Sequence, residues 1–320
     1  MVTFSQSELD DLPVAAERIE DLYPLSPMQT GILFHSVFQI DSRAYVNQLR
    51  VNIAQLSVAR FRTAWQAVVD RHSILRTGFL PEGRVPLQWV AKTATLPFAE
   101  YDWRRQDFTS QSDREQALDA LAQSELMTGF RLDQPPLIKI ALVHCSGQPS
   151  HLILTLHHLL LDGWSTSQLL GEVLRIYSGE EPALPVSRYR DFIDWLSGRD
   201  ANAAEHYWKT LLQSVTEPTR LVSSSGKMHA DSGFEEYTHV LDSGLVSAAS
   251  QFAMQQRITL NTLMQAVWAL VLKQRTGQSQ VTFGVTVAGR PAGLPGADRI
   301  LGLFINTLPV AVTFRPEWTV

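Results

Sequence analysis

One run of residues dominates the sequence: Leu154-Thr155-Leu156-His157-His158-Leu159-Leu160-Leu161-Asp162-Gly163-Trp164-Ser165. Its first part continues an apolar segment from residue 151, which predicts a strand ending at two adjacent histidines. Its Asp-Gly pair predicts the turn into the next helix. Neighbouring side chains of a strand point to opposite faces of the sheet. His158 is therefore expected to share a face with Leu154 and Leu156, and the two rings cannot both serve one reaction centre.

These residues suit two interpretations. An imidazole at the end of an apolar strand is a candidate general base near neutral pH. Asp162 can order the turn by accepting backbone N–H groups or by pairing with an arginine. Gly163 permits a positive φ and the close approach of a ligand or another chain. Packed histidines and ordinary Asp-Gly turns are also common, so the spacing alone leaves that plainer interpretation open.

The composition bounds the fold and the partners. The 320 residues suit two lobes better than one ordinary compact domain. Apolar residues make up 45% and charged residues 18%, which is typical of a soluble globular protein with sizeable cores. The formal net charge is −5 and no lysine or arginine run occurs. Such a surface does not attract a phosphate backbone, so we expect no nucleic-acid partner.

The single cysteine, Cys145, excludes an intramolecular disulfide framework and a Cys-x-x-Cys zinc pair, and it is expected in the core. No metal site is expected, since no His-Glu-x-x-His or comparable spacing occurs. The N-terminal residues lack a basic segment followed by an apolar one, which argues against a signal peptide. The apolar stretches are too short or too polar to span a bilayer. We therefore expect a cytoplasmic protein that is not attached to a membrane.

Other catalytic patterns are incomplete. Ser225-Gly226-Lys227 is faintly similar to the end of a phosphate-binding loop, but Leu221 stands where that pattern needs glycine. No Gly-x-Ser-x-Gly elbow for a hydrolytic serine occurs. A dinucleotide-binding Gly-x-Gly-x-x-Gly is also missing. Residues 154–165 are therefore the best candidate site.

The remaining patterns interleave helices and strands, which predicts an α/β sandwich. Helices are predicted over residues 27–38, 58–70, 112–127, 165–177, 188–196, 203–212, 245–254 and 260–274. Strands are predicted over 46–53, 86–90, 94–98, 137–143, 151–158, 237–241, 281–288 and 304–314, with a long surface connection over 214–233. Residues 178–185 are rich in proline, glycine and charge and predict a lobe boundary. The predicted parts are a linker (1–20), a first lobe (21–180) and a second lobe (181–320).

The pattern His157-His158-x-x-x-Asp162-Gly163 resembles the signature of nonribosomal peptide synthetase condensation domains, which are relatives of chloramphenicol acetyltransferase and the dihydrolipoyl acyltransferases. Four further motifs resemble those of the family in the family's order: Leu25–Gln29, Arg71–Phe79, Tyr189–Trp195 and Leu301–Thr307. They also have structural interpretations, such as a helix start with Ser26 as N-cap, an ion pair of Arg76, and an aromatic helix face that packs. Together the motifs extend over nearly the whole chain.

The resemblance implies two chloramphenicol acetyltransferase-like α/β lobes in a V arrangement, with a tunnel between them. Upstream (donor) and downstream (acceptor) peptidyl carrier proteins dock at its mouths, and an adenylation domain is the expected neighbour. Each carrier delivers a thioester on a covalently attached 4′-phosphopantetheine arm, so the domain itself binds no cofactor. The acceptor's α-amino group attacks the donor thioester and gives an amide. The domain is expected to be monomeric.

The resemblance also assigns roles to individual residues. His158 matches the second histidine of the signature, which is the catalytic one. Asp162 resembles a structural aspartate that pairs with an arginine of the other lobe, and Arg290 stands where that arginine is expected. The remaining expected site residues are His157 and Gly163, with structural roles, and Trp164, Ser165 and Asn306, which line the substrate tunnel.

The sequence departs from the family at its end, because the family's last two motifs have no counterpart before Val320. A truncated second lobe with exposed sheet edges is therefore expected. Two alternatives to condensation stay open. One is a docking module that binds carrier proteins without activity, and the other is an acyltransferase that acts on a small soluble acceptor. An epimerising relative shares the signature, but Trp164-Ser165 after the glycine is more similar to condensation domains.

Overall fold

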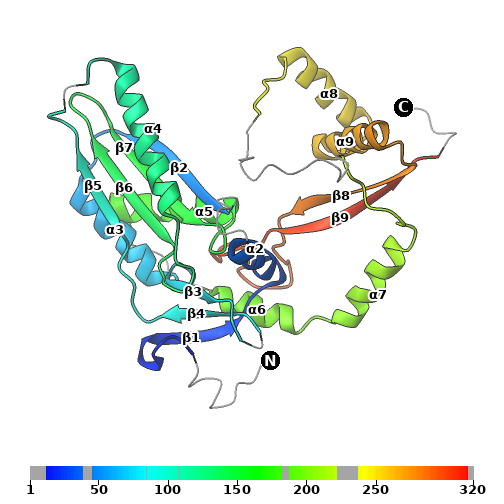
Figure 1. Ribbon diagram of the computed structural model, residues 1–320, viewed down its shortest axis with the longest axis horizontal. Helices are drawn as coiled ribbons and strands as arrows, with labels where there is room; N and C mark the ends of the chain where they lie inside the picture. The colour runs from blue at the N-terminus through cyan, green and yellow to red at the C-terminus, as the bar shows by residue number, and fades with distance from the viewer. Residues whose placement is uncertain are drawn as a thin grey trace. The chain divides into compact units, whose positions relative to one another are not determined.

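The computed structural model describes residues 12–38, 45–83, 85–106, 108–181, 187–221 and 237–315 (Figure 1). The chain forms two compact units. The first unit comprises Met1–Arg199 and Ala288–Asn306, and the second comprises Asp200–Val287 and Thr307–Val320. Each unit is described by itself.

A four-stranded sheet forms the centre of the first unit. Its order is β2 (Val46–Ile53), β7 (Ser150–His157), β6 (Ile138–His144) and β5 (Phe98–Asp102). β5 runs parallel to β6, and the other pairs are antiparallel. The predicted strands at 46–53, 137–143 and 151–158 are confirmed to within a residue.

The strand predicted at 94–98 is wrong, because β5 begins only at Phe98. The preceding residues bond to a side chain of α3 (Val58–Arg71) instead of to a neighbouring strand. The amide of Gln66 donates to the carbonyl oxygen of Ala94 at 2.8 Å and accepts the N–H of Leu96 at 3.0 Å. The backbone groups that a strand would use are thereby taken.

Helices cover both faces of this sheet (Figure 1). α3 and α5 (Gly163–Ser178) pack on the face that carries Leu154 and Leu156, and together they enclose the main hydrophobic core. α4 (Gln111–Thr128) lies on the opposite face, where Ile153 packs against Ala122. Alternate side chains of β7 therefore point to opposite faces of the sheet, as the sequence predicted.

A smaller sheet places β4 (Leu87–Ala91) between β1 (Ile19–Pro24) and β3 (Thr77–Leu80). Two 3₁₀ turns precede its strands, η1 (Ala16–Arg18) before β1 and η2 (Ser73–Arg76) before β3. Arg76 is buried and its Nη1 lies 2.6 Å from Oε2 of Glu20. The predicted ion pair of Arg76 is therefore confirmed.

The helix predicted after Ser26 is confirmed as α2 (Pro27–Phe38). Ser26 Oγ accepts the N–H of Gln29 at 3.2 Å, and Gln29 Oε1 accepts the N–H of Ser26 at 3.0 Å. This reciprocal pair is a capping box, in which two backbone donors of the first turn are satisfied. Pro27 takes the first helical position, where a missing N–H costs nothing.

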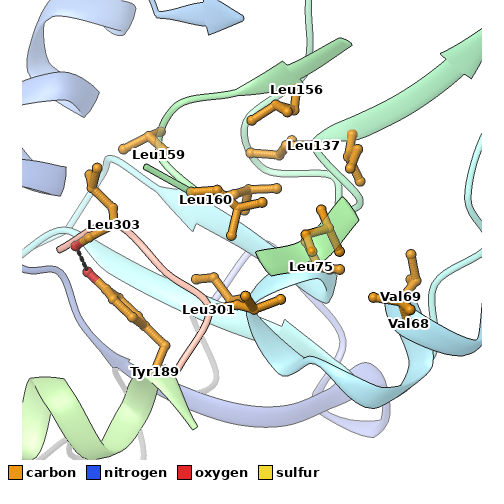
Figure 2. Close-up of a cluster of buried hydrophobic side chains, with 14 of the residues drawn as sticks. Val68, Val69, Leu75, Leu137, Leu156, Leu159, Leu160, Tyr189, Leu301 and Leu303 are labelled. Atoms are coloured by element: carbon orange, nitrogen blue, oxygen red, sulfur yellow. Dashed lines mark hydrogen bonds between the residues drawn. The ribbon is translucent and has the colours of Figure 1, made fainter. Parts of the chain in front are cut away.

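The lobe boundary predicted at residue 181 differs from the division of the compact units. α6 (Tyr189–Ser197) belongs to the first unit, and so does the returning segment Ala288–Asn306. Figure 2 shows why: Tyr189, Leu301 and Leu303 lie in the same buried cluster as Val68, and the Tyr189 hydroxyl donates to the carbonyl oxygen of Leu303 at 2.7 Å. Residues 182–185 of the predicted boundary lie outside the described residues.

The second unit contains α7 (Ala201–Leu212), α8 (Ser243–Gln255) and α9 (Leu260–Thr276), and it pairs β8 (Gln280–Val287) with β9 (Asn306–Thr313). The strand predicted at 237–241 is wrong. These residues form no regular structure, and Tyr237 is 89% exposed. No described strand pairs with them, and an isolated extended segment has no ladder to join. Most of the predicted connection, residues 222–233, lies outside the described residues.

The position predicted for Cys145 is also wrong, since it is partly exposed and not in the core. It follows β6, where the chain has left the sheet. Partial burial raises the pKa of its thiol. No helix within the described ranges is long and apolar enough to cross a membrane.

Candidate active site

His158 stands where the chain leaves β7. Its backbone N–H donates to the carbonyl oxygen of Tyr45 at 2.7 Å, which continues the antiparallel pairing of β7 with β2 by one residue. The residue is partly exposed. Its Nδ1 is buried and has no hydrogen-bond partner among the described residues. Part of the imidazole residue is therefore exposed, while Nδ1 is enclosed.

The neighbouring His157 has a different environment. Its residue is 4% exposed, and burial together with the adjacent His158 lowers its pKa to about 4. The ring is therefore neutral at pH 7. Its Nδ1 accepts the backbone N–H of Leu159 at 3.2 Å, so the proton of the neutral ring lies on Nε2. The ring packs edge-on against Phe130. His157 shapes the turn, while His158 faces the accessible side.

The turn after the histidines is anchored through its backbone. The N–H of Leu160 donates to the carbonyl oxygen of His157 at 3.1 Å. Nε2 of Gln29 donates to the carbonyl oxygen of Leu159 at 3.1 Å. All three leucines of the turn are fully buried. These contacts give the turn one conformation.

Asp162 begins α5 and holds a distant segment at the same time. Its Oδ1 accepts the N–H of Ser165 at 2.8 Å, which is a helix N-cap. Its Oδ2 accepts the N–H of Phe304 at 3.0 Å. The nearest guanidinium nitrogen of Arg290 is 3.6 Å from Oδ1. Both structural roles expected of Asp162, ordering the backbone and pairing with Arg290, are found.

Arg290 is fixed by more than this ion pair. Its Nη2 donates to Ser165 Oγ at 2.6 Å, and its Nη1 donates to the carbonyl oxygens of Ile300, at 2.9 Å, and Ala297. The guanidinium lies over the ring of Phe304 at 4.1 Å. Burial lowers the pKa of this guanidinium. An arginine of the other lobe was expected, but Arg290 belongs by its packing to the first unit.

The prediction that Ser165 lines a substrate tunnel is wrong. The residue has no exposed surface, and its hydroxyl is fully bonded. Ser165 Oγ donates to the carbonyl oxygen of Gly302 at 2.7 Å and accepts from the Gly302 N–H at 3.1 Å and from Arg290. One donor and two acceptor sites are the whole capacity of a serine hydroxyl. Ser165 therefore joins α5 to the segment at residue 302.

Comparison with known families identifies this arrangement. The family model of the condensation domain matches residues 19–320. The chain belongs to the condensation domain family. It is 38% identical over 315 residues to a linear gramicidin synthase protein of Brevibacillus parabrevis, covering 94% of this chain and 6% of that protein. It is 32% identical over 321 residues to bacitracin synthase 3 of Bacillus licheniformis, covering 97% of this chain and 5% of that protein. The chain thus spans a small part of the length of these relatives.

Solved condensation-type structures have the same fold. The EpoB cyclization-docking bidomain from Sorangium cellulosum superposes with a TM-score of 0.77 at 23% identity, covering 96% of this chain and 62% of that one. The first condensation domain of the calcium-dependent antibiotic synthetase gives a TM-score of 0.70 at 20% identity, with coverages of 93% and 71%. The predicted fold class, an α/β chain of chloramphenicol acetyltransferase-like architecture, is therefore confirmed.

Three further predicted site residues of this condensation domain are accessible. Trp164 is 60% exposed, and its Nε1 donates to the carbonyl oxygen of Asp298 at 3.3 Å. Asn306 is exposed at the start of β9. Gly163 begins α5 without the positive φ that glycine permits. A Cβ at Gly163 would meet nothing within 4 Å. Of the two properties predicted for this glycine, the structure therefore shows the open space beside the turn and not the positive φ.

Gly302 and Gln29 also hold the turn. They lie in the motifs Leu301–Thr307 and Leu25–Gln29 but were not among the predicted site residues. Gly302 is needed because a Cβ there would lie 2.1 Å from Cδ2 of Tyr189. Gln29 reaches the carbonyl oxygen of Leu159, the residue after the catalytic candidate. The spacing Ser26-x-x-Gln29 is typical of a capping box, so the sequence predicts the contacts between Gln29 and Ser26. Nothing local in the sequence signals the contact with Leu159.

Proposed function

We propose that this condensation domain forms an amide bond between a donor acyl or peptidyl thioester and an acceptor aminoacyl thioester. Both substrates are carried on the 4′-phosphopantetheine arms of peptidyl carrier proteins, one upstream and one downstream, with an adenylation domain as neighbour. Family membership supports the reaction class, since matched relatives are peptide synthases. The observation that carries the proposal is the partly exposed His158 on a turn that is anchored by backbone and side-chain hydrogen bonds.

The proposed reaction balances without a cofactor. The acceptor's α-amino nitrogen bonds to the donor's carbonyl carbon, the carbon–sulfur bond breaks, and the proton lost by nitrogen ends on the departing sulfur as a carrier thiol. A free α-amino group has a pKa of about 7.7–8.0, so a useful neutral fraction exists at pH 7. Alignment of the two tethered reactants supplies much of the acceleration, because well-oriented intramolecular reactions reach effective molarities of roughly 10⁵ M or more.

The buried Nδ1 supports a hydrogen-bond donor role for His158. A proton on Nδ1 would be a buried N–H without a described partner, which costs about 1–3 kcal/mol. We infer that the proton lies on Nε2, because buried donors without a partner are rarer in proteins than buried acceptors without one. We infer that this N–H bonds to the oxygen of the tetrahedral intermediate, where negative charge develops.

The test uses carrier proteins loaded with donor and acceptor, and it measures dipeptidyl thioester by mass spectrometry. We expect product from the wild type and a loss of at least about 100-fold in His158→Ala, which is the usual scale for a group that stabilises developing charge. His144→Ala is the matched control. His144 is a partly buried histidine at the end of β6 that bonds Ser150, at the opposite end of β7 from His158.

Three results would contradict the proposal. Unchanged product from His158→Ala would remove this residue from the mechanism. Binding of carriers by the wild type without any product would favour a docking module. Transfer to free amines or alcohols without an acceptor carrier would favour an acyltransferase for small acceptors.

A further inference from the structure

Two glutamines that lie 59 residues apart form a buried amide pair. Gln29 lies in α2 and Gln88 lies in β4, and neither has exposed surface. Nε2 of Gln29 donates to Oε1 of Gln88 at 3.2 Å, and Nε2 of Gln88 donates to Oε1 of Gln29 at 2.9 Å. An amide is unfavourable in a core unless its polar atoms are bonded, so this pair depends on the completeness of its contacts.

Gln29 also forms hydrogen bonds with two backbone groups. Its Oε1 also accepts the N–H of Ser26, and its Nε2 also donates to the carbonyl oxygen of Leu159 at 3.1 Å. An amide side chain has two donors and two acceptor sites, so Gln29 is saturated. Gln88 directs its second donor elsewhere, to the carbonyl oxygen of Pro24 at 3.0 Å.

The contact with Leu159 lies one residue after His158. The Leu159 N–H is already bonded to His157, and the Leu159 side chain lies in the buried cluster of Figure 2. Gln29 is thus the side chain that fixes the remaining polar group of this residue. Without it, a buried carbonyl would have no partner and its peptide group would rotate toward another donor.

We propose that Gln29 is a positioning residue for amide formation, which acts through the Leu159 carbonyl to fix the turn that presents the His158 ring. The inference rests on the proposed role of His158. Gln29 does not contact the substrate in this scheme. Its effect is on the alignment of the ring, and misplacement by about 1 Å at a reacting centre costs on the order of 100-fold in rate.

The two glutamines offer a matched comparison. Gln29→Met and Gln88→Met both remove the reciprocal amide bonds from the same buried site and leave an apolar side chain of similar length. Gln29→Met also removes the bonds to Leu159 and to the N–H of Ser26, whereas Gln88→Met also removes the bond to Pro24. Gln29→Glu is the second variant, because a carboxylate keeps the acceptor bonds to Ser26 and Gln88 but loses the donor bonds to Leu159 and Gln88.

The experiment measures kcat and KM for dipeptidyl thioester formation together with the NMR titration of the His158 ring. In Gln29→Met we expect kcat to fall about 10- to 100-fold with KM within about twofold, and the His158 resonances to shift or broaden. In Gln88→Met we expect kcat within about threefold and an unperturbed His158 signal. If Gln29→Met does not fold, Gln29→Glu is expected to show the same separation from Gln88→Met.

Equal losses of kcat in the Gln29 and Gln88 variants, or an unchanged His158 titration in the Gln29 variants, would overturn the proposal. Failure of the proposed function has a different signature. In that case His158→Ala retains activity, while the NMR comparison still reports whether Gln29 holds the histidine turn.

Discussion

The Oδ2 atom of Asp162 accepts the backbone N–H of Phe304 at 3.0 Å, across 142 residues of chain. The other oxygen of the same carboxylate caps α5 through Ser165. One buried side chain therefore starts the helix that follows the histidine turn and holds the Gly302–Phe304 segment beside it. The signature of this condensation domain therefore marks a structural joint as well as the histidine that we propose to be catalytic.

The first prediction concerns this joint. Asp162→Ala is expected to lower the free energy of unfolding by about 3 kcal/mol or more, because it leaves the buried N–H groups of Ser165 and Phe304 without their acceptor and the partly buried Arg290 without its ion-pair partner. Chemical denaturation with urea measures the change. Ser110→Ala is the control, since it removes an exposed helix N-cap of the same unit and is expected to cost about 1 kcal/mol. If Asp162→Ala were inactive yet as stable as wild type, Asp162 would have a direct catalytic role.

The second prediction concerns the hydroxyl of Ser165. Ser165→Ala leaves the N–H of Gly302 and one donor of Arg290 without their acceptor, while the Gly302 carbonyl oxygen keeps the N–H of Asp162. Each unsatisfied buried group costs about 1–3 kcal/mol, so we expect a total loss of about 2 kcal/mol or more in urea unfolding. Ser167→Ala, which removes an exposed hydroxyl two residues away, should change stability by less than about 0.5 kcal/mol. Similar stabilities of the two variants would mean that the Ser165 bonds contribute little.

The third prediction separates two glycines of the signature motifs. Gly302→Ala places a methyl group against the Tyr189 ring and is expected to destabilise by about 3 kcal/mol or more, as overpacked cores do. Gly163→Ala meets open space at a helical φ and should leave stability within about 1 kcal/mol of wild type. Because that space lies beside the turn, we expect Gly163→Ala to slow amide formation. Full activity in a stable Gly163→Ala protein would show that the substrate does not use this space.

Strongly periodic segments made most of the fold predictable. The apolar alternation of residues 151–158 and the helical spacing of residues 58–70 appear in the structure within a residue or two as β7 and α3. The error at residues 94–98 has a tertiary cause, because Gln66 binds backbone groups that the pattern assigns to a strand. Side-chain contacts of this kind are invisible to a local pattern.

The candidate site was predictable in its residues but not in their contacts. The signature predicted His158 and Asp162 as site residues and the family resemblance predicted Arg290, and the structure brings Asp162 and Arg290 to 3.6 Å. The buried role of Ser165 was missed, although its position three residues after the N-cap is where a helix start bonds to the capping side chain. The link from Gln29 to Leu159 spans 130 residues and could be found only in the fold.

The fourth prediction is a pH dependence of stability caused by His157. Its pKa is about 4 in the folded protein and about 6.5 in the unfolded chain. Between these values the unfolded chain binds a proton that the folded protein does not, so stability falls as the pH drops through this window. At about 1.4 kcal/mol per pKa unit, the loss from pH 7 to pH 4 is about 3 kcal/mol. In His157→Asn, which has an oxygen acceptor but does not titrate, the slope of unfolding free energy against pH should decrease. An unchanged slope would show that His157 is not the cause.

The fifth prediction asks what the His158 ring contributes. A glutamine at this position carries an amide N–H donor but cannot act as a base near pH 7. If the Nε2–H of His158 stabilises the oxygen of the intermediate, His158→Gln should retain a measurable part of the activity that His158→Ala loses, about tenfold or more above the alanine variant. Its pH–rate profile should still rise with deprotonation of the acceptor's α-amino group, because that step does not need the imidazole. The measurement is single-turnover dipeptidyl thioester formation from about pH 6 to pH 9 with both variants and wild type. Equal inactivity of the glutamine and alanine variants, with a wild-type profile that follows titration of the imidazole, would make His158 a proton acceptor instead of a donor.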